Sequence, residues 1–209
     1  MTEVNTVPTP VGPPSVRPMR ADAVRNRERV LDAARKLFAA QSGNVSVEQP
    51  SMEQIARAAG VGVGTMYRNW PSRSDLVEEV YRDNLAGLAA LAAQVQSEQP
   101  PWDALVQWLR GYLQHAQSKR GMLTELNAAF DARPELRNES RRQVLQAAEM
   151  VLAPAQAAGV VRADLTAADL MQLVSGMVLP AVADPSRYPY LLDVVLDGIR
   201  SGTATRSGR

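Results

Sequence analysis

The sequence predicts an all-α fold. Apolar residues recur three and four positions apart along most of its 209 residues, which is the spacing that one buried face of an α-helix requires. No run of alternating apolar residues is long enough for a pair of strands, and no segment repeats with a period of roughly 20–50 residues. We expect about nine helices, with an N-terminal three-helix unit followed by a C-terminal helical bundle.

The composition is that of an ordinary globular chain, with 45% hydrophobic and 22% charged residues. Cysteine is absent from the sequence, which excludes a disulfide framework, a thiolate zinc site and a cysteine nucleophile. The sequence has neither the charged-then-apolar order of a signal peptide nor an apolar stretch of about 18 residues. We therefore expect a cytoplasmic protein without a membrane segment.

Charge is unevenly distributed along the chain, although the net charge is only +1. Residues 1–75 contain ten basic and seven acidic side chains, and subtraction from the totals of 23 and 22 leaves 13 basic and 15 acidic ones for the remainder. A basic N-terminal part favours contact with phosphates, because neutralising phosphates releases their bound counterions. This charge asymmetry is modest, so it supports DNA binding only together with a DNA-binding motif.

The N-terminal segment changes character after residue 19. Residues 1–19 contain five prolines, a composition that neither propagates a helix nor forms a core, so we expect a disordered arm. A helix is predicted from Ala21 to Ala40, and a break over residues 41–50. The apolar stripe of this helix consists of Val30, Ala34, Leu37 and Phe38.

Two short helices follow the break. Ser51 and Gln54 have the spacing of a capping box, which predicts a helix start after Ser51. This helix should end at Gly60, where glycine can adopt a left-handed conformation. A second short helix is predicted from Val63 to Trp70. Two helices joined by so tight a turn form a helix-turn-helix pattern, in which the second helix can enter the major groove of DNA. An ordinary helical hairpin gives the same pattern, so the spacing alone leaves both interpretations open.

The rest of the chain is predicted to contain six further helical segments. A long helix capped by Ser72 runs from Arg73 to about Val95, and Pro154 should kink or split a later one. We divide the chain into a DNA-binding unit at 20–75, a second domain at 76–201 and a flexible tail at 202–209. The expected later segments are 102–118, 121–130, 134–159, 166–182 and 188–199.

The amino-acid sequence around the turn distinguishes between the two interpretations. The segment from Ile55 to Leu76 reads IARAAGVGVGTMYRNWPSRSDL. This segment resembles the signature of the TetR (tetracycline-repressor) family, and the match extends from about Val30 to Leu76. The resemblance implies a helix-turn-helix regulator with an all-helical effector-binding and dimerisation domain. Beyond residue 80 it is limited to architecture and to the turn at Ser118–Gly121.

Carried over by position, the resemblance implies a set of residues that contact DNA. Arg68 can pair with a guanine edge and Asn69 with adenine, while Tyr67 and Arg73 are expected to contact phosphates. A core aromatic is the alternative interpretation of Tyr67. The full set is Ser51, Val63, Gly64, Thr65, Tyr67, Arg68, Asn69 and Arg73.

The second domain is expected to bind a small hydrophobic effector. An aromatic and a cationic effector are the two kinds that we consider. Its aromatic and methionine side chains suit an adaptable apolar pocket, although plain core packing is the alternative for each of them. His115 is the single histidine, and neither a metal site, a cofactor nor catalysis is expected from it. The predicted pocket residues are Trp108, Tyr112, His115, Phe130 and Met150.

The last two predicted helices carry more apolar surface than one intramolecular contact needs. Two such helices from each subunit would form a four-helix dimer interface. The residues expected there are Leu170, Val174, Met177, Leu192, Val195 and Ile199.

These observations together predict a repressor that binds a palindromic operator in double-stranded DNA as a homodimer and is released by its effector. A helical transferase or hydrolase is the enzymatic alternative, but the sequence offers no nucleophile–base pair for it. An architectural DNA-binding protein without a small ligand is the third hypothesis.

Overall fold

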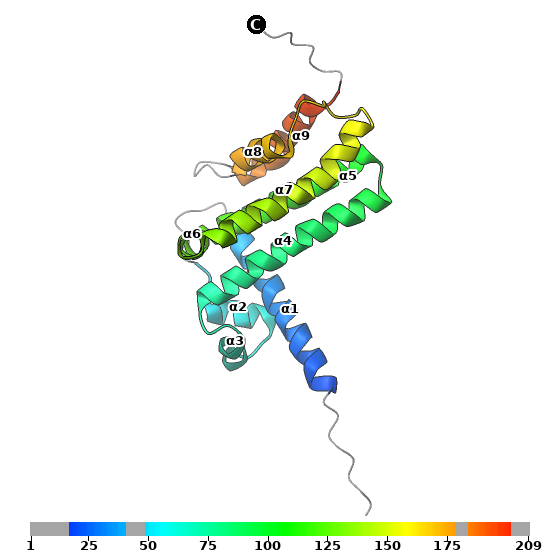
Figure 1. Ribbon diagram of the computed structural model, residues 1–209. Helices are drawn as coiled ribbons and strands as arrows, with labels where there is room; N and C mark the ends of the chain where they lie inside the picture. The colour runs from blue at the N-terminus through cyan, green and yellow to red at the C-terminus, as the bar shows by residue number, and fades with distance from the viewer. Residues whose placement is uncertain (1–16, 41–48, 179–183, 202–209) are drawn as a thin grey trace, which may run out of the picture.

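The computed structural model describes residues 17–40, 49–178 and 184–201, together with the side chains from residue 22 onward. Within these ranges the chain is helical and forms no strand, which confirms the predicted all-α class. Figure 1 shows an N-terminal unit at one end of an elongated molecule and α8 and α9 at the other. The elements are α1 (Arg17–Ala40), α2 (Met52–Ala59), α3 (Val63–Asn69), α4 (Arg73–Glu98), α5 (Pro101–Arg120), α6 (Leu123–Ala132), α7 (Pro134–Ala157), α8 (Ala167–Val178), a 3₁₀ turn (Pro185–Arg187) and α9 (Tyr188–Ile199).

The turn between α2 and α3 has the predicted geometry. The side chain of Ser51 accepts a hydrogen bond from the Gln54 amide, and the Gln54 side chain accepts one from the Ser51 amide. Gly60 ends α2 with φ of 63°, and its amide donates to the carbonyls of Ala56 and Arg57. A residue with a Cβ would be strained at this φ, so glycine fixes the angle between the two helices.

The long helix α4 belongs to two hydrophobic cores. Its buried residues from Leu76 to Leu85 pack with α1, α2 and α3, whereas those from Leu88 to Val95 pack with the C-terminal helices. The helix begins at a capping box formed by Ser72 and Asp75, as predicted. One continuous helix therefore contributes to both cores and connects them.

The C-terminal bundle is built around α5. Trp108 of α5 is completely buried, and its indole N–H donates to the Leu88 carbonyl oxygen at 3.0 Å. Helices α4, α7 and α8 pack against α5, and α9 packs on α8 and α5. A buried Trp needs such a partner for its N–H, so this hydrogen bond fixes how α4 and α5 pair.

Helix α6 belongs to the N-terminal core although it lies within the C-terminal part of the sequence. Its residues Leu126 and Phe130 pack with α1 and the first half of α4. Just before α6, Gly121 lies against the end of α1, where an added Cβ would be 2.1 Å from the Phe38 carbonyl oxygen. Only glycine allows this approach of two backbones. The α5–α6 turn is therefore a fixed contact between the two units.

Several predicted boundaries need correction. Helix α1 begins at Arg17, so the last residues of the expected 1–19 arm are helical; residues 1–16 lie outside the described ranges, as does the tail at 202–209. Helix α8 is described only to Val178, and the expected continuation to residue 182 falls outside as well. Pro154 does not split α7, which continues to Ala157. It removes one amide donor in the last turn, where the buried Ala155 still packs on the core.

Candidate DNA interface and ligand cavity

Helix α3 presents one side to the protein and the other to solvent. Met66 is fully buried, whereas Val63 and Tyr67 are each 42% exposed and Arg68 and Asn69 are exposed. Figure 1 shows α3 at the end of the molecule farthest from α8 and α9. Large apolar residues on the surface of a short helix, next to charged and amide side chains, are typical of a recognition surface.

The polar residues of α3 already interact with one another. The Arg68 guanidinium donates to the Thr65 hydroxyl at 3.0 Å, and the Asn69 amide donates to the Thr65 carbonyl at 2.8 Å. Both side chains remain exposed, so a base edge can replace these local partners. The Tyr67 hydroxyl donates to Glu53 of α2 at 2.9 Å. This bond raises the pKa of the Tyr67 phenol, and the exposure of the ring excludes the core-aromatic alternative.

Ser51 and Gly64 lie beside this surface in different ways. The Ser51 hydroxyl caps α2 and is exposed at its N-terminus, and the N-terminus of a helix favours an anionic group such as phosphate. A Cβ added at Gly64 would meet nothing within 4 Å. The fold itself therefore does not require glycine at position 64.

Arg73 is not placed for the phosphate contact that we expected from the sequence. Its Nε donates to Glu125 of α6 at 2.5 Å, and its Nη2 donates to the Gln49 side chain at 2.9 Å. Its Nη1 donates to the Pro50 carbonyl, and the guanidinium lies over the Phe38 ring. A partly buried carboxylate competes effectively for a guanidinium, which is why the side chain turns inward. Arg73 therefore connects α1, α4 and α6.

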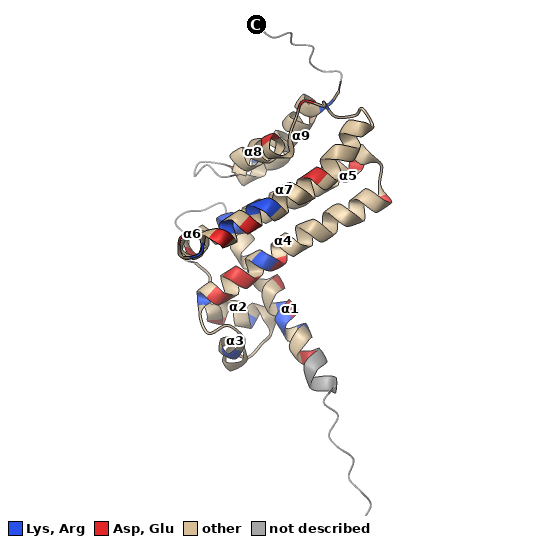
Figure 2. Ribbon diagram, viewed as in Figure 1, with Lys and Arg blue, Asp and Glu red and all other residues tan. Residues whose placement is uncertain are grey.

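Acidic residues on the first half of α4 hold the recognition unit in place. The Trp70 indole N–H, directly after α3, donates to Glu79 at 2.8 Å, and Arg27 of α1 pairs with the same carboxylate. Arg133, after α6, pairs with the buried Glu78. Figure 2 shows acidic residues on this part of α4, beside α1 and α6. The orientation of α3 is thus tied to α4 by charge-assisted contacts.

A cavity of about 450 Å³ lies among α4, α5, α6, α7 and α8. Its volume is in the range of small-molecule sites in proteins. Aromatic side chains from three helices line it, and α8 contributes Met171 and Ser175. The Tyr112 and Ser175 hydroxyls are 2.7 Å apart and join α5 to α8 across it. Its described lining consists of Tyr81, Tyr112, His115, Ala116, Lys119, Phe130, Arg137, Ser140, Arg141, Val144, Leu145, Ala168, Met171, Gln172 and Ser175.

Two basic groups in the lining have lowered pKa values. Burial, reinforced by nearby Lys119, lowers the pKa of His115 to about 3, so its imidazole is neutral. Burial and the charge of Arg137 also lower the pKa of the Lys119 ammonium. This ammonium lies 5.7 Å from the ring centroids of both Tyr81 and Phe130.

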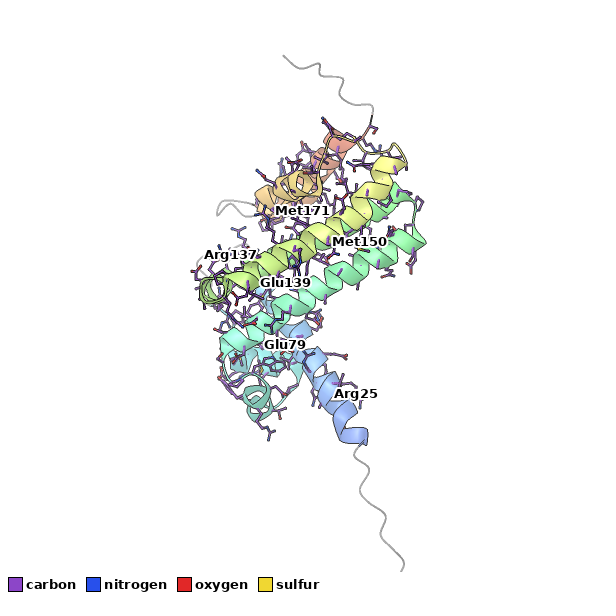
Figure 3. The ribbon with its side chains drawn as sticks, viewed as in Figure 1. Arg25, Glu79, Arg137, Glu139, Met150 and Met171 are labelled. Carbon is purple, nitrogen blue, oxygen red and sulfur yellow. The ribbon has the colours of Figure 1, made fainter. Side chains whose placement is uncertain are left out.

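The structure brings together part of the predicted pocket. Tyr112, His115 and Phe130 line the cavity, whereas Trp108 is fully buried in the bundle core and Met150 lies farther along α7 (Figure 3). Neither of the latter two lines the cavity. Sequence reasoning missed its basic residues, because their approach depends on how α5 and α7 pack. The sequence signal that could have led to Lys119 was its place in the noted Ser118–Gly121 turn.

The expected dimer residues divide into two groups. The structure corrects one group, because these side chains are at most 3% exposed within a single chain and cannot reach a partner: Leu170, Val174, Leu192 and Ile199. Their apolar stripes cover the bundle core instead. Met177 and Val195 are half-buried. The exposed apolar residues on the same helices are Leu173, Tyr190 and Val194, with exposed fractions of 48%, 56% and 50%.

Within the described ranges, no helix is long and apolar enough to cross a membrane. The same residues contain no group of three or more histidine and acidic side chains placed to hold a metal ion.

An exposed short helix held by a helix-turn-helix, carried on a helical bundle with a ligand-sized cavity, defines a DNA-binding regulator. A family model described as bacterial regulatory proteins of the tetR family matches residues 30–80. A second, described as the C-terminal domain of SbtR-like transcriptional regulators, matches residues 100–201. The chain belongs to the TetR family of transcriptional regulators. The family and the relatives named below are regulators and not enzymes.

Solved structures resemble nearly the whole chain. The TetR transcriptional regulator SCO0520 from Streptomyces coelicolor is 34% identical, with a TM-score of 0.71 over 85% of this chain and 99% of that one. A TetR regulatory protein from Mycobacterium vanbaalenii is 33% identical, with a TM-score of 0.65 over 88% of this chain and 99% of that one. The curated regulator SAB2452 of Staphylococcus aureus is 36% identical over 80 residues, which are 38% of this chain and 41% of its own length.

Proposed function

We propose that this regulator is a repressor that binds a palindromic operator as a homodimer and is released when a small molecule enters the cavity. The observation that carries the proposal is the shared core. Tyr81 and Phe130 line the cavity and also belong to the N-terminal core that supports α3. Their ring centroids are 5.7 Å apart. A ligand that displaces either ring therefore acts directly on the packing beneath the DNA-reading helix.

A dimer follows from the size of the recognition surface. Helix α3 has seven residues, and one such helix reads too few base pairs to specify a single site in a genome. Two-fold pairing doubles the site and makes it an inverted repeat. The exposed apolar face of α8 and α9, formed by Leu173, Tyr190 and Val194, supports pairing at the end opposite to α3.

Within each half-site, we assign base contacts to α3. Arg68 presents a fork that fits guanine, Asn69 fits adenine, and Val63 and Thr65 can contact a thymine methyl group. Tyr67 and the N-terminus of α2 at Ser51 contact phosphates, which set the position of the protein without reading sequence.

Release requires that the ligand bind one arrangement of the helices better than the other. The contacts of Arg73 with Glu125 and of Glu78 with Arg133 connect the two ends of α6 to α4. A ligand beside Phe130 that shifts α6 therefore changes the contacts that hold the first turns of α4. These turns directly follow α3 in the chain. The proposed outcome is a change in the separation of the two recognition helices in the dimer.

The test begins with selection of genomic DNA fragments that the purified protein retains. The selected site should contain an inverted repeat, and its affinity should exceed that of a scrambled duplex by about a thousandfold or more at physiological salt. Fluorescence anisotropy with both duplexes measures this ratio, and its salt dependence reports the phosphate contacts. Equal affinity for the two duplexes at physiological salt contradicts sequence-specific repression.

Loss of affinity in Arg68→Ala should be confined to one base position and amount to about 1–3 kcal/mol. The Arg57→Ala variant is the matched control, because Arg57 is exposed on α2 and lies outside the assigned contacts. If both variants lose affinity uniformly for all sequences, the assignment of Arg68 to a base is wrong.

A further inference from the structure

The cavity contains an unusual excess of positive charge. Among its described lining residues, three are cationic and none is an Asp or Glu: Lys119, Arg137 and Arg141. Arg137 and Arg141 are exposed on α7, and Arg137 pairs at 3.2 Å with Asp131, which lies outside the lining. Lys119 is partly buried on α5. Figure 2 shows the basic residues of α7 concentrated in its N-terminal half, next to α6. In Figure 3, Arg137 of α7 and Met171 of α8 mark two of the helices that enclose the cavity.

Lys119 has no ion pair with any carboxylate in the part of the chain that the structure describes. Its ammonium interacts instead with the faces of the Tyr81 and Phe130 rings. Such contacts compensate only in part for removing a charge from water. The neighbouring groove among α1, α4 and α5 differs in this respect, because its cations are paired: Arg35 with Asp83 at 3.0 Å and Lys36 with Asp32 at 2.7 Å.

A second, independent feature is a buried polar atom without a partner. The Nδ1 of His115 has no hydrogen-bond partner in the described structure, although the residue is only 7% exposed. Buried nitrogen atoms of this kind are normally satisfied. His115 lines the same cavity and lies one helical turn before Lys119. A neutral imidazole can place its proton on Nδ1 and donate it to an acceptor.

The other lining residues indicate what the uncharged part of a ligand is like. Tyr81, Tyr112 and Phe130 offer aromatic surfaces, and Val144, Leu145 and Met171 offer apolar ones. The Tyr112 and Ser175 hydroxyls bond to each other, so one hydroxyl hydrogen of the pair remains for a ligand oxygen.

We infer that the cavity binds a small organic anion, with an apolar body packed against the aromatic and aliphatic side chains of the lining and a carboxylate that pairs with Lys119. The partly buried ammonium gains a counter-ion that none of the described residues supplies, and Arg137 and Arg141 attract the anion from the exposed side of α7. This inference deepens the proposed function by naming the chemical class of the effector. It differs from the hydrophobic, aromatic or cationic effector expected from the sequence, because cations on the lining repel a positive charge.

The inference is tested with three probe molecules that have the same apolar group and an anionic, a neutral or a cationic head group. Isothermal titration calorimetry of the full chain without DNA compares naphthoate, naphthamide and naphthylmethylammonium, and the series is repeated with decanoate, decanamide and decylammonium. For at least one body, the carboxylate should bind at least about tenfold more tightly than its amide, and the ammonium should bind most weakly. The inference is overturned if neither carboxylate binds more tightly than its neutral and cationic counterparts.

Variants then locate the anion. Lys119→Met should reduce the affinity for the preferred carboxylate by about tenfold or more and leave the amide unaffected, while Lys119→Arg should retain the preference. The melting temperature of ligand-free Lys119→Met should be unchanged or higher, because an unpaired, partly buried cation is removed. A loss of the preference in Lys119→Met by a folded protein supports the site, and an unchanged preference places the anion elsewhere and overturns it.

The neighbouring arginines of α7 provide a matched pair. Arg141→Gln should weaken carboxylate binding, whereas Arg142→Gln removes the same charge from a side chain that pairs with Glu139 outside the cavity and should not. Equal losses in the two variants indicate a general charge effect and contradict the site. Operator release is measured separately by anisotropy: an anion that binds without releasing DNA leaves this inference intact and contradicts only the proposed regulation.

Discussion

Individual residues of α3 carry two separate constraints, one from the fold and one from the proposed DNA contact. Met66 is fully buried and holds α3 on the N-terminal core, while Val63 and Tyr67 point outward and contribute little to it. Gly64 lies on the open side with free space around it. Substitutions on the open side should therefore change DNA binding without changing stability.

Gly64→Ala is the sharpest such substitution. The added methyl group meets no protein atom, and alanine favours helix, so the melting temperature should stay constant or rise. Operator affinity should fall by about tenfold, because close approach of the DNA is blocked. Gly87→Ala is the control, since position 87 is equally open but lies on α4. Wild-type affinity in Gly64→Ala would show that α3 does not approach DNA at this residue.

His115 gives the stability a pH dependence of known sign. Burial lowers the pKa of His115 to about 3 in the folded state from 6.5 in the unfolded one. Between these values the unfolded state binds more protons, so folding stability present above pH 6.5 is lost as the pH falls. The slope should be of the order of 1 kcal/mol per pH unit.

Urea unfolding between pH 6.5 and 5 measures this slope in wild type and in His115→Gln. Carboxylates contribute equally to both proteins, so the difference between the slopes isolates the imidazole. Its ionisable neighbours are Lys119 and Tyr112 on its own helix and Tyr81 of α4. Identical slopes would mean that His115 is not buried in neutral form.

At the scale of elements, α8 and α9 each have one face in the bundle core and one face in solvent. Leu170 and Val174 are fully buried, and Leu173, between them, is 48% exposed. The two kinds of position should respond differently to a charge. A buried position affects the fold, and an exposed one affects only association.

The double variant Leu173→Glu, Val194→Glu should be folded and monomeric at micromolar concentration, because unpaired carboxylates on an apolar interface are costly to desolvate. Val174→Glu should instead lower the melting temperature strongly, as a charge enters the core. Light scattering gives the mass, and Val24→Glu, an exposed valine on α1, is the control. A dimer that persists in the double variant would exclude this face.

At the scale of the whole molecule, α4 and α6 make the N-terminal unit and the bundle one structure. The pair formed by Arg73 and Glu125 is the most enclosed link, with side chains 23% and 16% exposed. Helix α6 contributes its apolar face to the same core. A substitution of either residue of this pair should therefore lower the stability of both units.

Arg73→Met should lower the free energy of unfolding by about 2 kcal/mol, because it leaves the Glu125 carboxylate without its main partner. Adding Glu125→Gln should recover part of that loss, with a coupling of about 0.5 kcal/mol or more in a double-mutant cycle. Urea unfolding of the four proteins measures it. Strictly additive effects would show that the two side chains do not act as a pair.

Local sequence signals determined the helices and the recognition unit. The capping boxes at Ser51 and Ser72, the left-handed Gly60 and the apolar stripes require only contacts within a few residues, and the structure confirms them. The signature from Ile55 to Leu76 predicted the family for the same reason. The geometry of caps, turns and helices depends on residues that are neighbours in the sequence, so local patterns predict it.

Tertiary structure alone decided which side of each later helix is buried and which charges meet. The apolar stripes of α8 and α9 are wider than the buried face of each helix, so periodicity could not separate core residues such as Val174 from exposed ones such as Leu173. Arg73 turned inward because Glu125, 52 positions away, lies beside it in the fold. Lys119, Arg137 and Arg141 converge on one cavity only through the packing of α5 against α7. Contacts between distant segments leave no local pattern, and they define the ligand class that we infer.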